Sequence, residues 1–326
     1  PLRVMLQSMG VLMALAVNST KVIIWKLEYR NFLLMTIDRK FYPLGLLLCF
    51  TFLVLLASGC VSNPEFDGDT AFKHLVYQME LGPRTPGSQA HTDVITYIQS
   101  TLDDEGWQVK VQETVWENHL VRNIVAIKGE GKPVILLGAH YDSRFTADRD
   151  PDPALKNQPV PGANDGASGV AVLLELARVI PEDLDKEIWL VFFDAEDQGG
   201  IEGWDWILGS EAFAASLSTY PDKVVIVDMI GDSDLNIFLE QNSNDALANE
   251  VWATAADLGY QDYFIPTYKY SILDDHAPFA QLGIQAIDII DFDYPVWHTT
   301  QDTIDQVSST SLEIVGKTLF AWITAK

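Results

Sequence analysis

Three carboxylates crowd into four positions directly after an apolar segment, at Asp194, Glu196 and Asp197. Like charges this close resist ionising together, so such a cluster persists where cations or protons neutralise it. The preceding residues, Ile188–Phe193, are continuously apolar and predict a buried strand. The sequence therefore places concentrated negative charge at a strand end, and some other part of the chain or a bound ion must compensate it.

Polar residues close other apolar segments or open helices in the same way. These residues are His140 with Asp142, Asp165, Asp228, Asp274 with Asp275 and His276, and His298. An aspartate alone in such a place more often forms a turn or caps a helix. Its repetition along the chain, with histidines among the carboxylates, argues for a shared site.

Two imidazoles with three or more carboxylates form a nitrogen and oxygen ligand set that suits zinc. The only cysteines, Cys49 and Cys60, lie near the N-terminus, so no thiolate competes in the rest of the chain. A divalent cation would keep adjacent carboxylates ionised in a partly buried site. Catalytic zinc needs three protein ligands and an open position, so one carboxylate of a pair can bind metal while its neighbour moves protons.

The elements that must position these residues follow from the apolar pattern. Helical spacing predicts helices around residues 72–79 and 94–102, on either side of a Gly/Pro-rich loop. Strands are predicted at 107–115, 121–127, 134–137, 188–193, 224–227 and 284–290. A further helix is predicted at 166–180, and an Asp/Pro-rich loop at 142–164. Continuous apolar strands are typical of sheets covered on both faces. We therefore predict an α/β protein, with a single three-layer α/β/α domain and a mostly parallel central sheet, in which ligands bind beyond the carboxyl ends of the strands.

The charge balance excludes some partners. The first 60 residues hold six of the 21 basic residues and two of the 46 acidic ones, which leaves 15 against 44 and a formal charge of −29 from residue 61 onward. No basic cluster is available to neutralise phosphates, so we predict binding to neither nucleic acid nor anionic lipid. The excess acid is compatible with a well-solvated surface, a salty habitat or recruitment of cations.

The N-terminal region is predicted to be an export segment. An apolar run follows Arg39 and Lys40 and is short for a bilayer span, while Ala57-Ser-Gly-Cys60 resembles the lipobox of prokaryotic lipoproteins. We expect a signal or lipoprotein segment at 35–60, so that the protein is exported as a lipoprotein on the outer side of the cytoplasmic membrane or secreted. An uncleaved membrane anchor and a buried helix are the alternatives. The remaining boundaries are predicted as upstream translation at 1–34, a linker at 61–68 and a zinc-dependent catalytic domain at 69–326.

Several motifs together resemble one family. They are Leu81-Gly-Pro-Arg-Thr-Pro-Gly-Ser88, His140-Tyr-Asp142, the Gly-Ala-Asn-Asp165-Gly loop, Glu196-Asp197, Asp228 and His298-Thr-Thr-Gln-Asp302-Thr. As a set they are similar to the zinc exopeptidases that include bacterial leucyl aminopeptidases and glutamate carboxypeptidase. The resemblance extends over nearly all of residues 70–326.

The resemblance implies a role for each matching position. Asp165 is the central, potentially bridging ligand, and Asp197 with His298 completes one zinc site. His140 and Asp228 complete a second zinc site, with Asp142 orienting His140 from behind. Glu196 takes the place of the family's general base. Many relatives have a second glutamate where this chain has Asp197.

Local features resemble the glutaminyl cyclase branch of that family more closely. They are Asp274-Asp275-His276, Trp297 directly before His298, the Ala195-Glu196-Asp197 form of the acidic pair, and the aromatic pair Trp204 and Trp206. The branch usually holds one zinc and converts an N-terminal glutamine of a peptide into pyroglutamate with loss of ammonia. Trp297 and Trp204 are expected to bind substrate, and Asp228 and Asp274 to share a proton with Glu196. There are structural alternatives to these roles. The tryptophans could pack in the core or on the surface, Asp275 could cap a helix, and Asp142 could have a purely structural role.

The leading hypothesis is thus a zinc-dependent glutaminyl-peptide cyclotransferase, an acyltransferase that acts on peptide or protein N-termini with one zinc ion. The alternative is a metallo-aminopeptidase of the same family with two zinc ions, in which Glu196 would activate water. A third possibility is a non-catalytic binding module, since some members of the superfamily are receptors. The intact ligand set and Glu196 argue against the third.

Overall fold

The computed structural model describes residues 4–8, 11–18, 21–28, 31–37 and 64–325. Its contacts divide the chain into two units, residues 1–62 and 63–326. In the first unit β1 (Val4–Ser8), β2 (Val11–Asn18), β3 (Lys21–Glu28) and β4 (Asn31–Ile37) form an antiparallel sheet in sequence order. Apart from residues 35–37 in β4, the predicted export segment and Cys60 lie outside the described residues. No helix among the described residues is long and apolar enough to cross a membrane.

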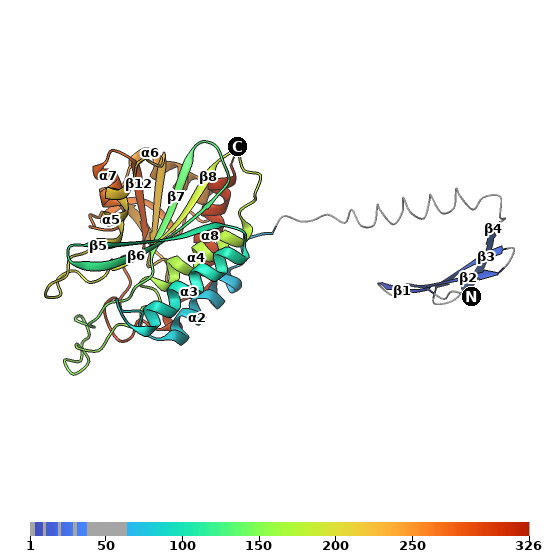
Figure 1. Cartoon of the computed structure of the whole chain (residues 1–326), viewed down its shortest axis with the longest axis horizontal. Coiled ribbons are helices and arrows are strands. Elements are labelled where there is room, and N and C mark those ends of the chain that lie inside the picture. The colour runs from blue at the N-terminus through green and yellow to red at the C-terminus, as the bar shows by residue number, and fades with distance from the viewer. Residues whose placement is uncertain (1–3, 9–10, 19–20, 29–30, 38–63, 326) are drawn as a thin grey trace. The chain divides into compact units, whose positions relative to one another are not determined.

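The second unit is built on a six-stranded sheet in the order β12-β9-β7-β8-β6-β5 (Figure 1). The strands are β5 (Gln108–Trp116), β6 (His119–Lys128), β7 (Val134–His140), β8 (Glu187–Phe193), β9 (Lys223–Asp228) and β12 (Gln285–Ile290). The pairs β12–β9, β9–β7 and β7–β8 are parallel, whereas β8–β6 and β6–β5 are antiparallel. The predicted mostly parallel sheet is confirmed, and each of its strands lies within a few residues of its predicted position.

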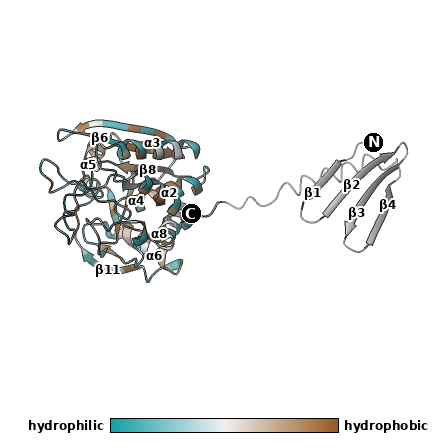
Figure 2. Ribbon diagram, turned by 90° about the horizontal axis from the view of Figure 1, so that it is seen from below, coloured by the Kyte–Doolittle hydropathy of each residue, from teal (hydrophilic) through white to brown (hydrophobic). Residues whose placement is uncertain are grey.

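Helices cover both faces of this sheet, which confirms the three-layer prediction. One core contains Leu137 of β7 with residues of α2, α3, α4, α6 and α8, and the other contains Leu136 with Phe213 of α5 and Phe279 of α7. The helices are α2 (Gly68–Leu81), α3 (Gln89–Asp104), α4 (Ala167–Val179), α5 (Leu208–Ser216), α6 (Asp245–Asp257), α7 (Ala277–Gln281) and α8 (Ser309–Thr324). Helices α2 and α3 carry both brown hydrophobic and teal hydrophilic residues (Figure 2), as expected of helices with one face on a sheet.

Several elements were not predicted. Besides α5, α6 and α8, the chain forms a two-stranded parallel sheet from β10 (Ile237–Glu240) and β11 (Phe264–Tyr270). Most of the β11 side chains are not buried, and its pairing with β10 is irregular. A short, exposed strand carries no apolar run, so little in the local residue pattern indicates it.

A buried arginine fixes the loop that leads to the site. Arg84 lies in the loop between α2 and α3 and is fully buried. Its Nε donates to the carbonyl of Tyr141 at 3.1 Å, and its two terminal nitrogens donate to the carbonyls of Pro161 at 3.0 Å and Gly162 at 2.6 Å. A guanidinium presents these donors in a fixed fork. It therefore ties the end of β7 to the loop that carries Asp165.

We predict that Arg84→Lys lowers the free energy of unfolding by about 3 kcal/mol, because an ammonium cannot reach all three carbonyls and leaves buried acceptors unpaired. Urea unfolding followed by circular dichroism measures the change. Arg122→Lys is the matched control, since that side chain is 30% exposed and pairs with the 58% exposed Glu113. The control should change stability by about 0.5 kcal/mol or less. Equal losses in the two variants would contradict a special role for Arg84.

Candidate active site

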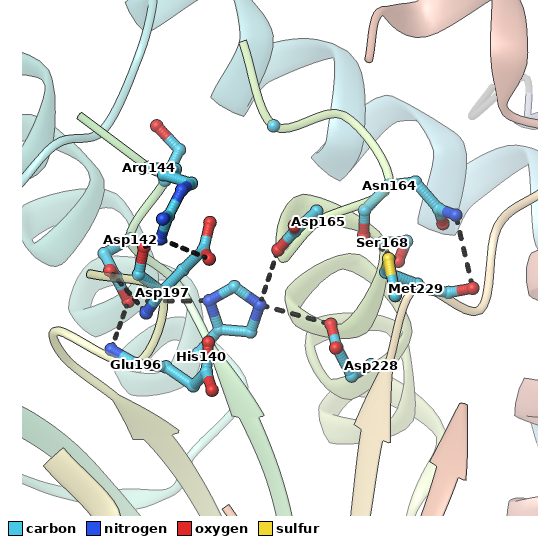
Figure 3. A network of polar contacts seen from close by, with 12 residues as sticks. His140, Asp142, Arg144, Asn164, Asp165, Ser168, Glu196, Asp197, Asp228 and Met229 are labelled. Carbon is cyan, nitrogen blue, oxygen red and sulfur yellow. Dashed lines mark hydrogen bonds and ion pairs between the residues drawn. The ribbon is translucent and has the colours of Figure 1, made fainter. Parts of the chain in front are cut away.

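The predicted polar residues converge at the carboxyl edge of the parallel strands. Strand β7 ends at His140, β9 ends at Asp228, and the acidic segment at 194–197 directly follows β8. Figure 3 shows His140 and Asp228 at these strand ends, facing Asp165. Because neighbouring parallel strands end at the same edge, residues far apart in sequence meet there.

One group of three buried residues could hold a metal ion. Asp165, Asp197 and His298 each offer a ligand atom, and these atoms lie within 4.8 Å of one another. His298 Nε2 is 2.8 Å from Asp197 Oδ1 and 3.7 Å from Asp165 Oδ2. Asp165 Oδ2 and Asp197 Oδ2 are buried acceptors without a hydrogen-bond donor. A cation would satisfy these orphaned oxygens, so the residues fit the zinc site predicted for them.

A second group shares Asp165 with the first. His140 Nε2 lies 3.1 Å from Asp165 Oδ1 and 3.2 Å from Asp228 Oδ1 (Figure 3). These three residues also offer ligand atoms within 4.8 Å of one another. Asp165 therefore lies between the two groups, and the second group could hold another metal ion.

Asp142 is placed behind His140, but its contacts extend further than predicted. Its Oδ1 is 3.5 Å from His140 Nδ1, a charge contact rather than a hydrogen bond. The same carboxylate accepts from the backbone N–H of Glu196 at 3.1 Å and from the side-chain amide of Gln198 at 2.9 Å. Asp142 therefore orders the turn that presents the acidic pair.

Two further positioning residues were not assigned a role from sequence. Asp302 accepts from the backbone N–H of Asn164 at 2.8 Å and of Asp165 at 3.3 Å, which orients the central carboxylate. Arg144 donates to the backbone carbonyl of Asp197 at 2.8 Å. Asp302 lies within the His298 motif, which was a signal for its importance, whereas nothing in the sequence distinguishes Arg144 from other arginines.

Asp194 faces away from the site. It is buried and accepts from the backbone N–H of Arg122 at 2.8 Å, and its other oxygen lies 2.7 Å from His91 Nε2. These contacts tie β8 to β6 and α3. Asp194 is therefore a structural hydrogen-bond acceptor rather than part of the candidate site.

Burial shifts the titration of the acidic groups. Desolvation, with repulsion from Asp274 and Asp275, raises the pKa of Glu196 well above its usual value, although His140 opposes the shift. Desolvation and the neighbouring Asp228 raise the pKa of Asp274 to about 7. Desolvation also raises the pKa of Asp228. These three carboxylates line one cavity, and a raised pKa favours retention of a proton, which is the property required of groups that move protons.

The cavity is about 300 Å³ and combines the acidic groups with aromatic walls. Trp297 and Trp206 line it, together with Phe292 and Tyr270. Trp204 is placed elsewhere, because it stacks on His119 with ring centroids 3.7 Å apart and packs with a separate apolar cluster. Trp206 rather than Trp204 therefore lines the cavity.

A third acidic group lies beside the cavity. Asp274, His276 and Asp288 place ligand atoms within 4.8 Å of one another, and both carboxylate oxygens of Asp288 lack a hydrogen-bond donor. Sequence reasoning missed Asp288. An aspartate inside the apolar run of β12 was the available signal, since a buried carboxylate in such a strand requires a partner or a proton.

Comparisons with known proteins agree with the geometry. The model of peptidase family M28 matches residues 123–323. The chain is 25% identical over 302 residues to a glutaminyl-peptide cyclotransferase of Boiga irregularis, with 76% of this chain and 80% of that protein covered. It is 32% identical over 282 residues to the aminopeptidase YwaD of Bacillus subtilis, with 78% and 56% covered. The crystal structure of Tannerella forsythia glutaminyl cyclase superposes with a TM-score of 0.74 at 35% identity, over 81% of this chain and all of that one.

We predict that Asp165→Asn strongly reduces zinc binding, because the substitution removes the one carboxylate common to both ligand groups. Zinc content after dialysis against a buffered zinc concentration measures the effect. Asp232→Asn is the matched control, because Asp232 is also buried but belongs to none of the ligand groups. Unchanged zinc content in Asp165→Asn would contradict the assigned ligand set.

We also predict that the metal-free protein becomes less stable as pH rises from about 5 to 8. The pKa of Asp274 and of Asp302 is about 7 in the folded protein, against about 4 in an unfolded chain. Between these values the folded protein binds more protons than the unfolded chain, so the free energy of unfolding falls as pH rises from about 4 to about 7. Burial lowers the pKa of His298, but attraction to Asp197 outweighs it and raises the pKa to about 9, so the loss of this proton also reduces stability as pH rises above about 6.5. Thermal unfolding with and without zinc measures the slope. Zinc should flatten it, and a metal-free midpoint that rises with pH would contradict the prediction.

Proposed function

The chain belongs to peptidase family M28, and from this premise we propose that it is a zinc-dependent glutaminyl-peptide cyclotransferase. The reaction converts the N-terminal glutamine of a peptide into pyroglutamate with release of ammonia. The observation that carries the proposal is the cavity itself, which is lined by Trp206 and Trp297 and by three carboxylates with raised pKa values, Glu196, Asp228 and Asp274. Likeness to glutaminyl cyclases in both sequence and structure supports it.

Asp165, Asp197 and His298 are the proposed zinc ligands, and one zinc ion is the expected content. Zinc bound there would polarise the γ-carboxamide carbonyl of the substrate glutamine. Arg144 and Asp302 hold two of these ligands through the backbone contacts described above. His140 remains beside Asp228 and Asp165, where it stabilises their negative charge.

Glu196 is the proposed proton carrier. The α-amine of the substrate attacks its own γ-carbonyl carbon, which forms the new C–N bond and releases a proton. Glu196 accepts that proton and delivers it to the amide nitrogen, which leaves as ammonia when the original C–N bond breaks. A carboxylate with a raised pKa can both accept and donate near neutral pH. Asp274 and Asp228 would adjust its protonation through the shared cavity.

The cavity also suits the exclusion of water. Its walls include Trp297, Trp206 and Ile290, and its volume of about 300 Å³ accommodates a side chain rather than an extended peptide. A cyclase needs no water in its reaction, so an aromatic wall near Glu196 favours intramolecular attack over hydrolysis.

A metallo-aminopeptidase is the second candidate. The observation that favours it is the second ligand group, His140, Asp165 and Asp228, which could hold another metal ion. In that case Glu196 would accept a proton from water rather than from the substrate amine.

One experiment separates these functions. The zinc-reconstituted protein is given an N-terminal glutamine peptide and an N-terminal leucine peptide, with ammonia and free amino acid both measured. A cyclase releases ammonia from the first and leaves the second intact. Hydrolysis of the leucine peptide without ammonia from the glutamine peptide would overturn the proposal. Inactivity on both would favour a non-catalytic binding module.

We predict that Glu196→Gln reduces kcat by at least about 100-fold, because an amide cannot carry the proton. Zinc content should remain that of the unaltered protein, since Glu196 is not among the proposed ligands. Glu202→Gln on the following exposed turn is the control and should retain full activity. Turnover in Glu196→Gln at the original rate would exclude Glu196 as the proton carrier.

We further infer that residues 35–60 direct export, with Cys60 as the lipidated residue, and that residues 69–326 form the catalytic domain. The basic residues before the apolar run and the Ala57-Ser-Gly-Cys60 motif support this. Membrane fractionation of cells that express Cys60→Ala tests the lipid anchor. Loss of the protein from the membrane fraction is the expected result.

A further inference from the structure

A groove adjoins the cavity and shares one of its walls. It is about 510 Å³, and its lining includes Asp148, Arg149, Lys156 and Trp297. Trp297 also lines the cavity that contains Glu196. A peptide whose first residue occupies the cavity must continue outward, and the groove begins on the other side of this tryptophan.

Arg149 is held at a defined place in this groove. Its guanidinium lies 4.0 Å from the centroid of the Trp297 ring. Its backbone N–H donates to the carbonyl of His298 at 3.2 Å. The next residue, Asp150, is buried and accepts from the N–H and hydroxyl of Thr300 at 3.0 and 2.7 Å. The cationic loop is therefore fastened to the segment that carries a proposed zinc ligand.

The groove has an excess of positive charge in a strongly acidic domain. Within residues 64–325 neither Arg149 nor Lys156 forms an ion pair, and the Lys156 ammonium donates instead to the backbone carbonyl of Asp148 at 2.9 Å. The carboxylate of Asp148 already faces Arg144 at 2.8 Å and His298 Nδ1 at 3.5 Å. The side chains of Arg149 and Lys156 are therefore available to bind an anionic ligand, although 44 acidic residues are present after residue 60.

The part of the cavity rim formed by residues 270–273 offers no comparable charge. Leu273 is 56% exposed there, next to Ile272. Lys269, which lies near that rim, is paired with Asp293 at 2.6 Å. A negatively charged part of a substrate is therefore attracted toward Arg149 and Lys156 rather than toward β11.

We propose that this groove is a specificity subsite that receives the residues following the N-terminal glutamine, and that Arg149 and Lys156 select an acidic side chain there. The inference rests on the proposed function, because the reacting glutamine defines which residue enters the cavity. Attraction between the groove and the substrate carboxylate lowers KM and leaves the cyclisation step itself unchanged. The preferred substrate class is N-terminal glutamine peptides with Glu or Asp at the second or third position.

The test compares Gln-Glu-Ala-amide with Gln-Gln-Ala-amide, which differ in charge but hardly in shape. We expect kcat/KM for the acidic peptide to be about three- to tenfold higher at low salt, chiefly through KM, and the advantage to shrink at high salt. Arg149→Gln and, separately, Lys156→Gln should each reduce this ratio. Lys110→Gln, an exposed cation on β5 outside the groove, is the control and should preserve it. A ratio near one in the unaltered protein, or the same ratio in all variants, would overturn the subsite.

A binding measurement keeps the subsite distinct from the reaction. The same two peptides are titrated into the Glu196→Gln protein, and quenching of tryptophan fluorescence gives their Kd values. The acidic peptide should bind more tightly than the neutral one, and adding Arg149→Gln to the Glu196→Gln protein should abolish this difference. That result supports the subsite even if no ammonia is ever released. Release of ammonia from both peptides at equal rates with equal Kd values would instead support the cyclase and reject the subsite.

Discussion

Buried carboxylates held close together are the constraint on which this site depends. Six acidic side chains near the carboxyl edge of the sheet have raised pKa values because burial disfavours their charged forms. They are Glu196, Asp197, Asp228, Asp274, Asp275 and Asp288. Such a group folds only where protons or cations compensate it. In the proposed arrangement, His140, His298 and a bound metal ion would compensate some of these carboxylates, and retained protons would neutralise others.

Hydrogen bonds from surrounding residues hold the segments that carry these carboxylates in place. Arg84 ties the Asp165 loop to the end of β7, and Asp302 orients Asp165 through its backbone N–H. Asp142 orders the turn at Glu196 through backbone and side-chain contacts. None of these three residues lines the cavity. Their effect is to hold ligand carboxylates at separations that unassisted repulsion would enlarge.

The architecture and most residues of the candidate site could be predicted from the sequence, because both produce recognisable local residue patterns. Continuous apolar strands revealed the covered sheet, and a polar residue at each strand end indicated the convergent edge. The choice between Trp204 and Trp206 was not accessible, since it depends on how the turn after Asp197 packs and not on residue type. Trp206 is cation–π stacked with Arg144, 5.0 Å away, a tertiary contact that no spacing in the sequence encodes. Asp288 was missed because one carboxylate in an apolar run resembles an irregularity until its neighbours are known.

Asp197 illustrates how the backbone can adjust a ligand's reach. A glutamate arm at this position would extend one methylene further, so an aspartate ligand requires its main chain to lie closer to Asp165. Arg144 provides that constraint, because it donates to the carbonyls of Asp197 at 2.8 Å and Gly199 at 3.0 Å. Its Nε also pairs with Asp148, which faces His298 from the other side. One guanidinium therefore connects two proposed ligands with the loop of the cationic groove, so the proposed metal site and the proposed subsite depend on the same side chain.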